Sequence, residues 1–247
     1  MRRIAHVVVL LIVLAATTPE PSAGASPTDD NCPRTAAQQW GAPNRVDDFT
    51  DPAASLGGWY VYDGAGHVGN GMRTPQAIGV DGGLLTITGD PAGNSGGMAW
   101  LPGQLYGRWE VCMKSSVASP NYHSVALLWP DSENWPADGE IDFMEILDPQ
   151  RLVVTASLNH RDPKFPAPED PNYRASIQVD ATQWHAWAVE WTPGRVAGFV
   201  DGSQWFEVTD HIPQNPMHLC IQLDNFGGDL AERGQQSVDW VRQYPLP

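Results

Sequence analysis

Short β-prone segments recur along the chain, and turn signals separate them. Thr192-Pro193-Gly194 has the composition of a tight turn, and Asp201-Gly202 is typical of a two-residue hairpin. No helical pattern extends beyond a turn or two, with residues 229–236 the best short candidate, and 24 glycines and 22 prolines disfavour long helices. The segments expected as strands are 84–88, 98–101, 106–115, 124–129, 140–147, 153–159, 184–191, 195–200, 204–208, 217–223 and 237–243. Repeated strands without intervening helices predict an all-β sandwich or barrel.

The stretch at residues 138–147 reads Asp-Gly-Glu-Ile-Asp-Phe-Met-Glu-Ile-Leu. On a strand, side chains alternate between faces, so Glu140 and Asp142 share one face. Strict alternation would put Glu145 among the apolar residues, where an unpaired carboxylate is costly, but a β-bulge between Asp142 and Glu145 returns it to the acidic face. Two glutamates presented in this way can flank a glycosidic bond, and retaining hydrolysis uses a pair about 5–5.5 Å apart. A strand with a solvated acidic edge is the alternative.

Residues 140–145 also resemble the E-x-D-x-x-E signature of glycoside hydrolase family 16, in its bulged, laminarinase-like form. The resemblance extends over nearly all of the body, through blocks at residues 47–49, 81–87, 106–114, 135–139, 184–193 and 238–242, although Cys112 stands where the family usually has Arg. It implies a concanavalin-like jelly roll, a β-sandwich of two antiparallel sheets with a substrate cleft across the concave one. By this resemblance Glu140 is the nucleophile, Glu145 the acid/base, and Asp142 the carboxylate between them.

Four further side chains are candidates for substrate binding in that cleft. By resemblance Trp135, five residues before Glu140, forms a sugar-stacking wall, although a loop Trp packed on the sheet is the alternative. Trp129 ends the preceding strand and is a candidate for the same work. His160 stands where the family commonly has a His near the acid/base, but a lone His is more often structural. Gln222 matches a polar position on the last concave strand, either binding sugar hydroxyls or solvated.

The first 25 residues have the pattern of a secretory signal peptide, with a basic start, an apolar centre and a small-x-small cleavage site at residues 23–25. Their apolar run is too short for a comfortable membrane span, and no later stretch approaches one. We therefore expect a secreted, extracellular protein. After residues 1–25 we expect a loose N-terminal arm at residues 26–44 and one jelly-roll catalytic domain over residues 45–247.

The formal net charge of −15 argues against nucleic acid or an anionic membrane as a partner and is compatible with a neutral polysaccharide. We expect a monomer, with most of the 11 tryptophans in the core. Catalysis by two carboxylates requires no cofactor. Many members of the family carry a structural Ca²⁺ on the convex side, and Asp48 and Asp239 match carboxylates that can serve it, although two carboxylates distant in sequence are weak evidence for such a site.

Three cysteines allow one internal disulfide and leave one thiol over. Cys112 and Cys220 both lie in expected strands, which slightly favours that pair and leaves Cys32, in the arm, as the odd one. The alternative is that all three are unpaired.

These observations predict a secreted, retaining endo-β-glycanase acting on β-1,3- or mixed β-1,3/1,4-glucan. Glu140 attacks the anomeric carbon, and Glu145 protonates the leaving oxygen before it deprotonates water. The charge of Asp142 helps to hold Glu145 protonated at the start. The family also cleaves galactans. Two other functions stay open: a non-catalytic carbohydrate-binding jelly roll, since fold does not imply function, and a transglycosylase acting on cell-wall glycan.

Overall fold

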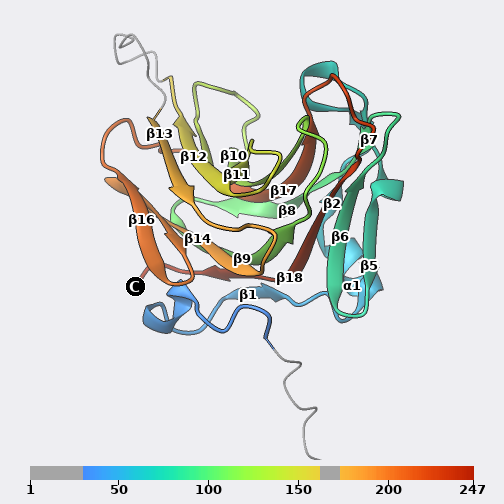
Figure 1. Ribbon diagram of the computed structural model, residues 1–247. Coiled ribbons are helices and arrows are strands. Elements are labelled where there is room, and N and C mark those ends of the chain that lie inside the picture. The colour runs from blue at the N-terminus through green and yellow to red at the C-terminus, as the bar shows by residue number, and fades with distance from the viewer. Residues whose placement is uncertain (1–29, 162–172) are drawn as a thin grey trace, which may run out of the picture. The chain divides into compact units, whose positions relative to one another are not determined.

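Two antiparallel sheets lie face to face in the computed structural model, which describes residues 30–161 and 173–247 (Figure 1). This arrangement confirms the expected all-β sandwich. The expected signal peptide lies outside the described residues. None of the helices in the described ranges has the length and hydropathy of a membrane span.

The upper layer in Figure 1 is the sheet that carries the acidic strand. In spatial order its strands are β13 (Tyr173–Gln178), β12 (Val153–Asn159), β11 (Glu140–Ile146), β10 (Tyr122–Pro130), β17 (Met217–Asn225), β8 (Gly97–Gln104) and β2 (Tyr60–Val61). One face of this sheet packs on the lower layer, and the other face is the floor of a cleft.

The lower layer, here called the outer sheet, closes the other side of the sandwich (Figure 1). Its order is β16 (Ser203–Val208), β15 (Arg195–Val200), β14 (His185–Thr192), β9 (Gly107–Ser115), β18 (Gly234–Tyr244), β6 (Leu84–Gly89) and β5 (Ile78–Asp81), and β1 (Arg45–Asp47) also pairs with β18. A small sheet joins β3 (Gly64–Ala65), β4 (Met72–Arg73) and β7 (Asn94–Ser95). The helices are α1 (Pro52–Gly58) and three short 3-10 turns, η1 (Ala36–Gln39), η2 (His67–Gly69) and η3 (Pro75–Ala77).

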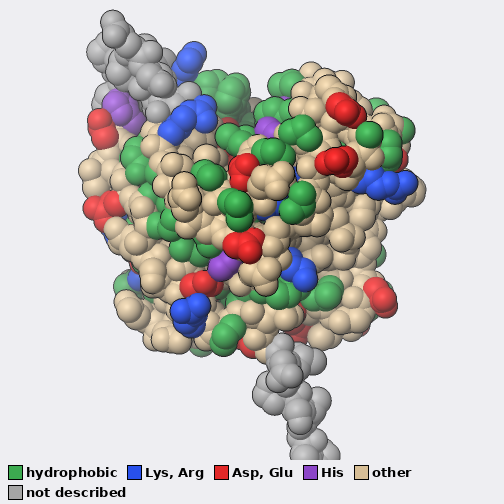
Figure 2. All heavy atoms as spheres, viewed as in Figure 1, with side chains coloured by type: hydrophobic (Ala, Val, Ile, Leu, Met, Phe, Trp, Pro, Cys, Tyr) green, Lys and Arg blue, Asp and Glu red, His purple; other side chains and the backbone are tan. Residues whose placement is uncertain are grey.

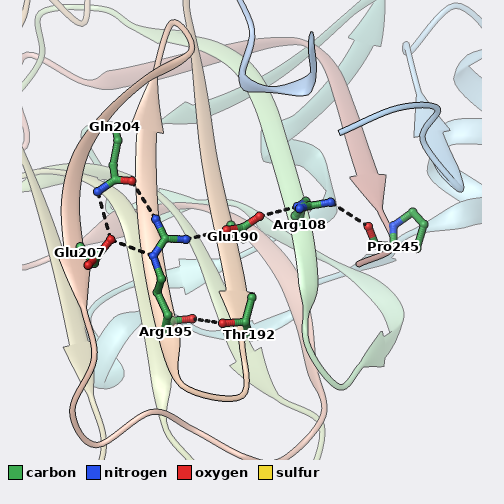
Figure 3. Close-up of polar contacts among 7 residues, drawn as sticks. All are labelled: Arg108, Glu190, Thr192, Arg195, Gln204, Glu207 and Pro245. Carbon is green, nitrogen blue, oxygen red and sulfur yellow. Dashed lines mark hydrogen bonds and ion pairs between the residues drawn. The ribbon is translucent and has the colours of Figure 1, made fainter. Parts of the chain in front are cut away.

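Alternation along each strand divides core from surface, as β14 illustrates. Trp187, Val189 and Trp191 point into the interior and are almost completely buried, because alternate residues of a strand share one face. Glu190 points to the outside of the sandwich, where Arg108 on β9 and Arg195 on β15 bind its two oxygens (Figure 3). The core therefore fills the space between the two sheets, and charged pairs lie on the outer face.

All the segments expected as strands form strands, with ends that differ by a few residues. The hairpin at Asp201-Gly202 is also confirmed: Val200 pairs with Ser203, and both turn residues have positive φ. The short helix expected at residues 229–236 is wrong, because a turn there runs directly into β18. The short edge strands β2 and β5 were not expected, since so few residues show no clear period, and β13 was missed although its apolar and polar residues alternate.

The expected pairing of Cys112 with Cys220 is wrong, because the disulfide joins Cys32 to Cys112 across a Cα–Cα distance of 5.9 Å. Cys112 lies in β9, in a cluster with Trp240 on the outer sheet. Cys220 lies in β17, in a separate cluster on the cleft side of the other sheet. The hydrophobic core separates the two clusters, so these side chains cannot meet.

The same disulfide corrects the expectation of a loose arm for its described part. Cys32 is held on β9, and the amide of Ala36 donates a hydrogen bond of 2.7 Å to the buried carboxylate of Glu110 on the same strand. Asn31 adds hydrogen bonds from its amide and its side chain to Asp239 on β18. From residue 31 onward, the arm is therefore fastened to the outer sheet.

Candidate active site

The register of β11 breaks in the middle of the acidic stretch. Against β10, Met144 pairs with Ala126 and Asp142 pairs with Leu127, so Phe143 is one residue more than its partner strand supplies. The pairing of β11 with β12 breaks over the same residues. This is the geometry of a β-bulge, and it confirms the bulge predicted between Asp142 and Glu145.

Because of the bulge, Glu140, Asp142 and Glu145 face the same side of the sheet and line one cleft. Phe143 and Met144 both point into the core instead, where neither is exposed. The local sequence explains the choice. Continued alternation would have buried the Glu145 carboxylate in that apolar core, at a cost larger than the loss of one ladder position.

The cleft has a volume of about 1020 Å³ and crosses the strands of the upper sheet. In the space-filling view, the upper edge of the molecule is notched between two groups of hydrophobic side chains (Figure 2). Trp129, Trp135 and Gln222, expected as substrate-binding residues, also line the cleft. A groove of this size, lined by both apolar and polar residues, is the expected place for a ligand.

Glu140 is oriented by two N–H donors that reach the same oxygen. The indole Nε1 of Trp135 donates to Oε2 at 2.8 Å, and the amide Nδ2 of Asn159 donates to the same atom at 3.0 Å. Burial raises the pKa of Glu140 above its usual range, and these two hydrogen bonds oppose that rise by favouring the charged form.

Asp142 is more deeply buried than either glutamate. Ser157 Oγ donates to its Oδ2, and Asn159 Nδ2 lies 3.4 Å from the same oxygen, whereas Oδ1 is buried without a hydrogen-bond partner in the described residues. Burial, followed by the charges of Glu140 and Glu145, raises the pKa of Asp142 well above its usual range. These surroundings disfavour the charged form of Asp142.

Glu145 has the properties of a general acid. Burial, followed by the charges of Asp224 and Glu140, raises the pKa of Glu145 to about 7, while Arg174 on the edge strand β13 acts in the opposite direction. At neutral pH, a large fraction of this carboxyl carries a proton. A general acid works best with a pKa near the working pH, and the environment gives Glu145 that value.

The two tryptophans form one wall of the cleft. Their rings are stacked, with centroids 6.3 Å apart and planes inclined by 10°. The indole Nε1 of Trp129 donates to Oε2 of Glu133 at 2.9 Å, which fixes the inner ring of the pair. Trp135 is half exposed, so it presents an aromatic surface to the cleft.

A polar cluster on β4 and β17 also lines the cleft. Arg73 donates to Gln222 and, at 2.5 Å, to Asp224, and its guanidinium lies 5.3 Å from the ring centroid of Tyr62. Oδ2 of Asp224 also lies 3.6 Å from Nδ1 of His67. Of this cluster, only Gln222 was expected from sequence. Alternation on β17 puts Asp224 on the same face as Gln222, whereas no local pattern points to Arg73, which is 151 positions away from Asp224 in the chain.

Ser157 and Asn159 were also missed, although the sequence carried a signal for them. Both lie on β12, where polar residues alternate with the buried Val154, Ala156 and Leu158. Alternation on a strand next to the acidic one places Ser157 and Asn159 on the acidic face.

One expectation based on the resemblance, His160, does not join this site, and the calcium expected on the convex side concerns another part of the fold. His160 is buried, its Nδ1 lies 2.6 Å from the carbonyl oxygen of His211, and it does not line the cleft. Of the carboxylates considered for calcium, Asp48 accepts hydrogen bonds from Thr50, and Asp239 accepts them from Asn31. Each carboxylate uses one oxygen in these contacts, and a structural calcium ion stays a prediction based on the resemblance.

Known proteins share this sequence pattern and this fold. The profile described as Glycosyl hydrolases family 16 matches residues 72–242. The laminarinase of Rhodothermus marinus superposes with a TM-score of 0.71 at 24% identity, covering 83% of this chain and 97% of that one. A β-1,3-1,4-glucanase (lichenase) derived from a mouse hindgut metagenome superposes with a TM-score of 0.68 at 20% identity, covering 82% and 99%. At these identities, the likeness shows the fold.

Two curated relatives match at 28% identity. One is a β-glucanase of Rhodothermus marinus, matched over 151 residues, which are 54% of this chain and 51% of the relative. The other is the clotting factor G alpha subunit of Tachypleus tridentatus, matched over 189 residues, which are 67% of this chain and 28% of the relative. The matches thus span about half of one relative and just over a quarter of the other.

Proposed function

The chain belongs to family 16 of the glycosyl hydrolases, and from this premise we propose that it is a secreted, monomeric, retaining endo-β-glucanase. The observation that carries the proposal is the bulge in β11, which puts Glu140, Asp142 and Glu145 on the cleft side of one strand. A solvated acidic edge needs no bulge, and its carboxylates would keep ordinary pKa values. Here burial raises the pKa of all three.

The two glutamates have different surroundings, and these support different roles. Trp135 and Asn159 donate to Glu140 and favour its charged form, which a nucleophile requires. Burial and two neighbouring carboxylates raise the pKa of Glu145 to about 7, so it can hold the proton that the leaving oxygen needs. Two carboxyls in different surroundings can thus serve as nucleophile and acid of one pair.

We assign β-1,3- or mixed β-1,3/1,4-glucan as the substrate. The solved structures that share the fold include a laminarinase and a lichenase, and one curated relative is a β-glucanase. The cleft itself combines a stacked tryptophan pair with many acidic groups, which suits a neutral polysaccharide better than an anionic one. Secretion is supported by the signal-like residues 1–25 and by the Cys32–Cys112 disulfide, because disulfides persist in oxidising compartments.

A non-catalytic carbohydrate-binding protein is the rival function, and the similarity to a clotting-factor subunit is the observation that favours it. The intact trio of carboxylates argues against it, since binding alone does not need three acidic groups gathered on one strand and shielded from water. Reducing-end assays on laminarin, lichenan, agarose and xyloglucan decide between the two. Product chain lengths in the same assays separate hydrolysis from transglycosylation.

Azide products test the roles of the two glutamates. Glu140→Gly removes the nucleophile, so azide attacks the anomeric carbon from the vacated side and gives the α-glycosyl azide from a β-substrate. Glu145→Gly still forms the glycosyl-enzyme from substrates with good leaving groups, and azide then attacks from the opposite face and gives the β-azide. Interchanged products would reverse the assignment. Hydrolysis at the wild-type rate by both variants would end the catalytic interpretation.

A further inference from the structure

We propose that Trp135 is a positioning residue for the nucleophile: its indole N–H, together with the Asn159 amide, holds Oε2 of Glu140 so that Oε1 is the oxygen that attacks the anomeric carbon. This inference rests on the proposed function and goes beyond it. Sugar stacking, the role that the resemblance gives to Trp135, uses only the faces of the ring. The structure shows a separate contact made by the ring edge.

Two different elements of the chain fix the orientation of the Glu140 carboxylate. Trp135 belongs to the loop before β11, and Asn159 is the last residue of β12, directly opposite Glu140 in the ladder. Their donor atoms lie 2.8 and 3.0 Å from the same oxygen, Oε2, and neither hydrogen bond involves Oε1. Two donors from different elements prevent rotation of the carboxylate, so its two oxygens are not equivalent.

Trp135 is itself held in the orientation that this contact needs. An indole has a single N–H donor, and Trp135 uses it on Glu140. One face of the ring is stacked on Trp129, whose own N–H is fixed on Glu133. The other face is left for a sugar. A sugar stacked on Trp135 therefore rests on the same rigid group that orients the nucleophile.

The covalent step follows from this arrangement. A lone pair of Oε1 forms the bond to the anomeric carbon as the bond to the leaving oxygen breaks, and that oxygen takes the electron pair and the proton of Glu145. Oε2 becomes the carbonyl oxygen of the glycosyl ester and continues to accept from Trp135 and Asn159. When water attacks, Glu145 takes its proton, and the electrons of the ester bond return to Oε1.

Trp135→Phe tests the edge contact separately from stacking, because phenylalanine keeps an aromatic face but has no N–H. We expect kcat on laminarin to fall about tenfold to a hundredfold, the range for one hydrogen bond to a charged group, with KM changed by less than about threefold. Asn159→Ala should lower kcat in the same way. The matched control is Trp205→Phe on β16 of the outer sheet, which should leave both constants unchanged, because the Trp205 N–H has no partner in the described residues.

A pH profile distinguishes positioning from a general loss of structure. The Trp135 hydrogen bond lowers the pKa of Glu140, so its removal raises that pKa and moves the acid limb of kcat/KM to higher pH. The other charged groups and histidines that line the cleft are unchanged in this variant: Asp142 and Glu145 on β11, His218 and Asp224 on β17, Arg174 on β13, Arg73 on β4, His67 on η2 and Glu133 in the loop. An unmoved acid limb with a wild-type kcat overturns the proposal.

The indole N–H signal of Trp135 gives a readout that needs no activity. Comparison of 1H–15N spectra of the wild type and Trp135→Phe assigns this signal, and Trp205→Phe assigns a reference signal. We expect Glu140→Gln to shift the Trp135 signal and to leave that of Trp205 unchanged. If Glu140→Gln leaves the chemical shift of the Trp135 signal unchanged, the proposal is overturned, even if the protein is an active glucanase. Failure of the proposed function shows itself differently, as absent azide products in both glycine variants.

Discussion

Glu190 on β14 and Asp142 on β11 are both carboxylates in the middle of a strand, and both are largely buried, yet their surroundings differ. Glu190 lies between two arginines, with Arg108 Nε at 2.6 Å and Arg195 Nη1 at 2.5 Å. Arg195 continues the chain of contacts to Glu207 and Gln204 (Figure 3). On this outer face, each charged group in this series contacts a group of opposite charge or a polar side chain.

Asp142 instead lies between two further carboxylates on the cleft side of its own strand. Its donors are the neutral Ser157 and Asn159, and burial together with the charges of Glu140 and Glu145 raises its pKa. The outer face thus uses carboxylates to complete ion pairs that hold neighbouring strands together. The cleft concentrates carboxylates beside one another, which costs stability and raises their pKa values, that of Glu145 to about 7. The ion pairs that stabilise the fold and the carboxylates proposed for catalysis therefore lie on opposite faces of the sandwich.

The largest effect is expected for Asp142→Asn. An amide keeps the size of the side chain but cannot exchange a proton with the glutamates, so kcat should fall about a hundredfold or more. The unfolding free energy at pH 7 should rise, by about 1 kcal/mol or more, since a buried carboxyl beside two other carboxylates is removed. Because the folded pKa of Asp142 is raised, its penalty grows as pH rises above about 3.9, the unfolded value, and is absent below it. Steady-state kinetics and urea unfolding at pH 7 and pH 3.5 check both parts.

Asp142→Asn could also lower the unfolding free energy. That result would show that the Asp142 carboxylate is a structural element of the cleft, like Glu190 on the outer face.

A second effect concerns pH. Because burial and the charges of Asp224 and Glu140 raise the pKa of Glu145 to about 7, kcat/KM should fall about tenfold per pH unit above that value, as the acid loses its proton. A carboxyl with a raised folded pKa also lowers stability as pH rises from its unfolded value, about 4.3, through 7. Glu145→Gln should flatten that part of the stability curve. If kcat/KM on laminarin already fell with rising pH below pH 5, Glu145 would not be the source of the proton that the leaving oxygen receives.

The smallest effect is expected on the outer face. Glu190→Gln leaves Arg108 and Arg195 without their shared carboxylate and should lower the unfolding free energy by about 1 kcal/mol, since these groups are only partly shielded from water. Glu207→Gln, at the exposed end of the same chain of contacts, is the matched control and should have a smaller effect. Neither variant should change kcat on laminarin. A fall in kcat for Glu190→Gln would show that the outer sheet shapes the cleft.

Much of the site follows from local sequence pattern. The spacing of Glu140, Asp142 and Glu145 within an apolar strand required a bulge, because the alternative buried a carboxylate in the core. The same alternation rule would have found Ser157 and Asn159. It also reaches Asp224, which lies two residues after Gln222 on β17. Arg73 could not be found in this way, because its contacts join strands that are far apart in the chain.

The sequence by itself determined the strand pattern, the family signature and the face on which the three carboxylates lie, since all of these depend on neighbours within a few residues. Only the tertiary structure decided the contacts between distant segments. It paired Cys32 with Cys112, because Cys220 lies beyond the core on the other sheet. It kept His160 out of the cleft, and it brought the edge of Trp135 onto Glu140. Period and turn chemistry are local properties, whereas the partner of a side chain depends on how the sheets stack.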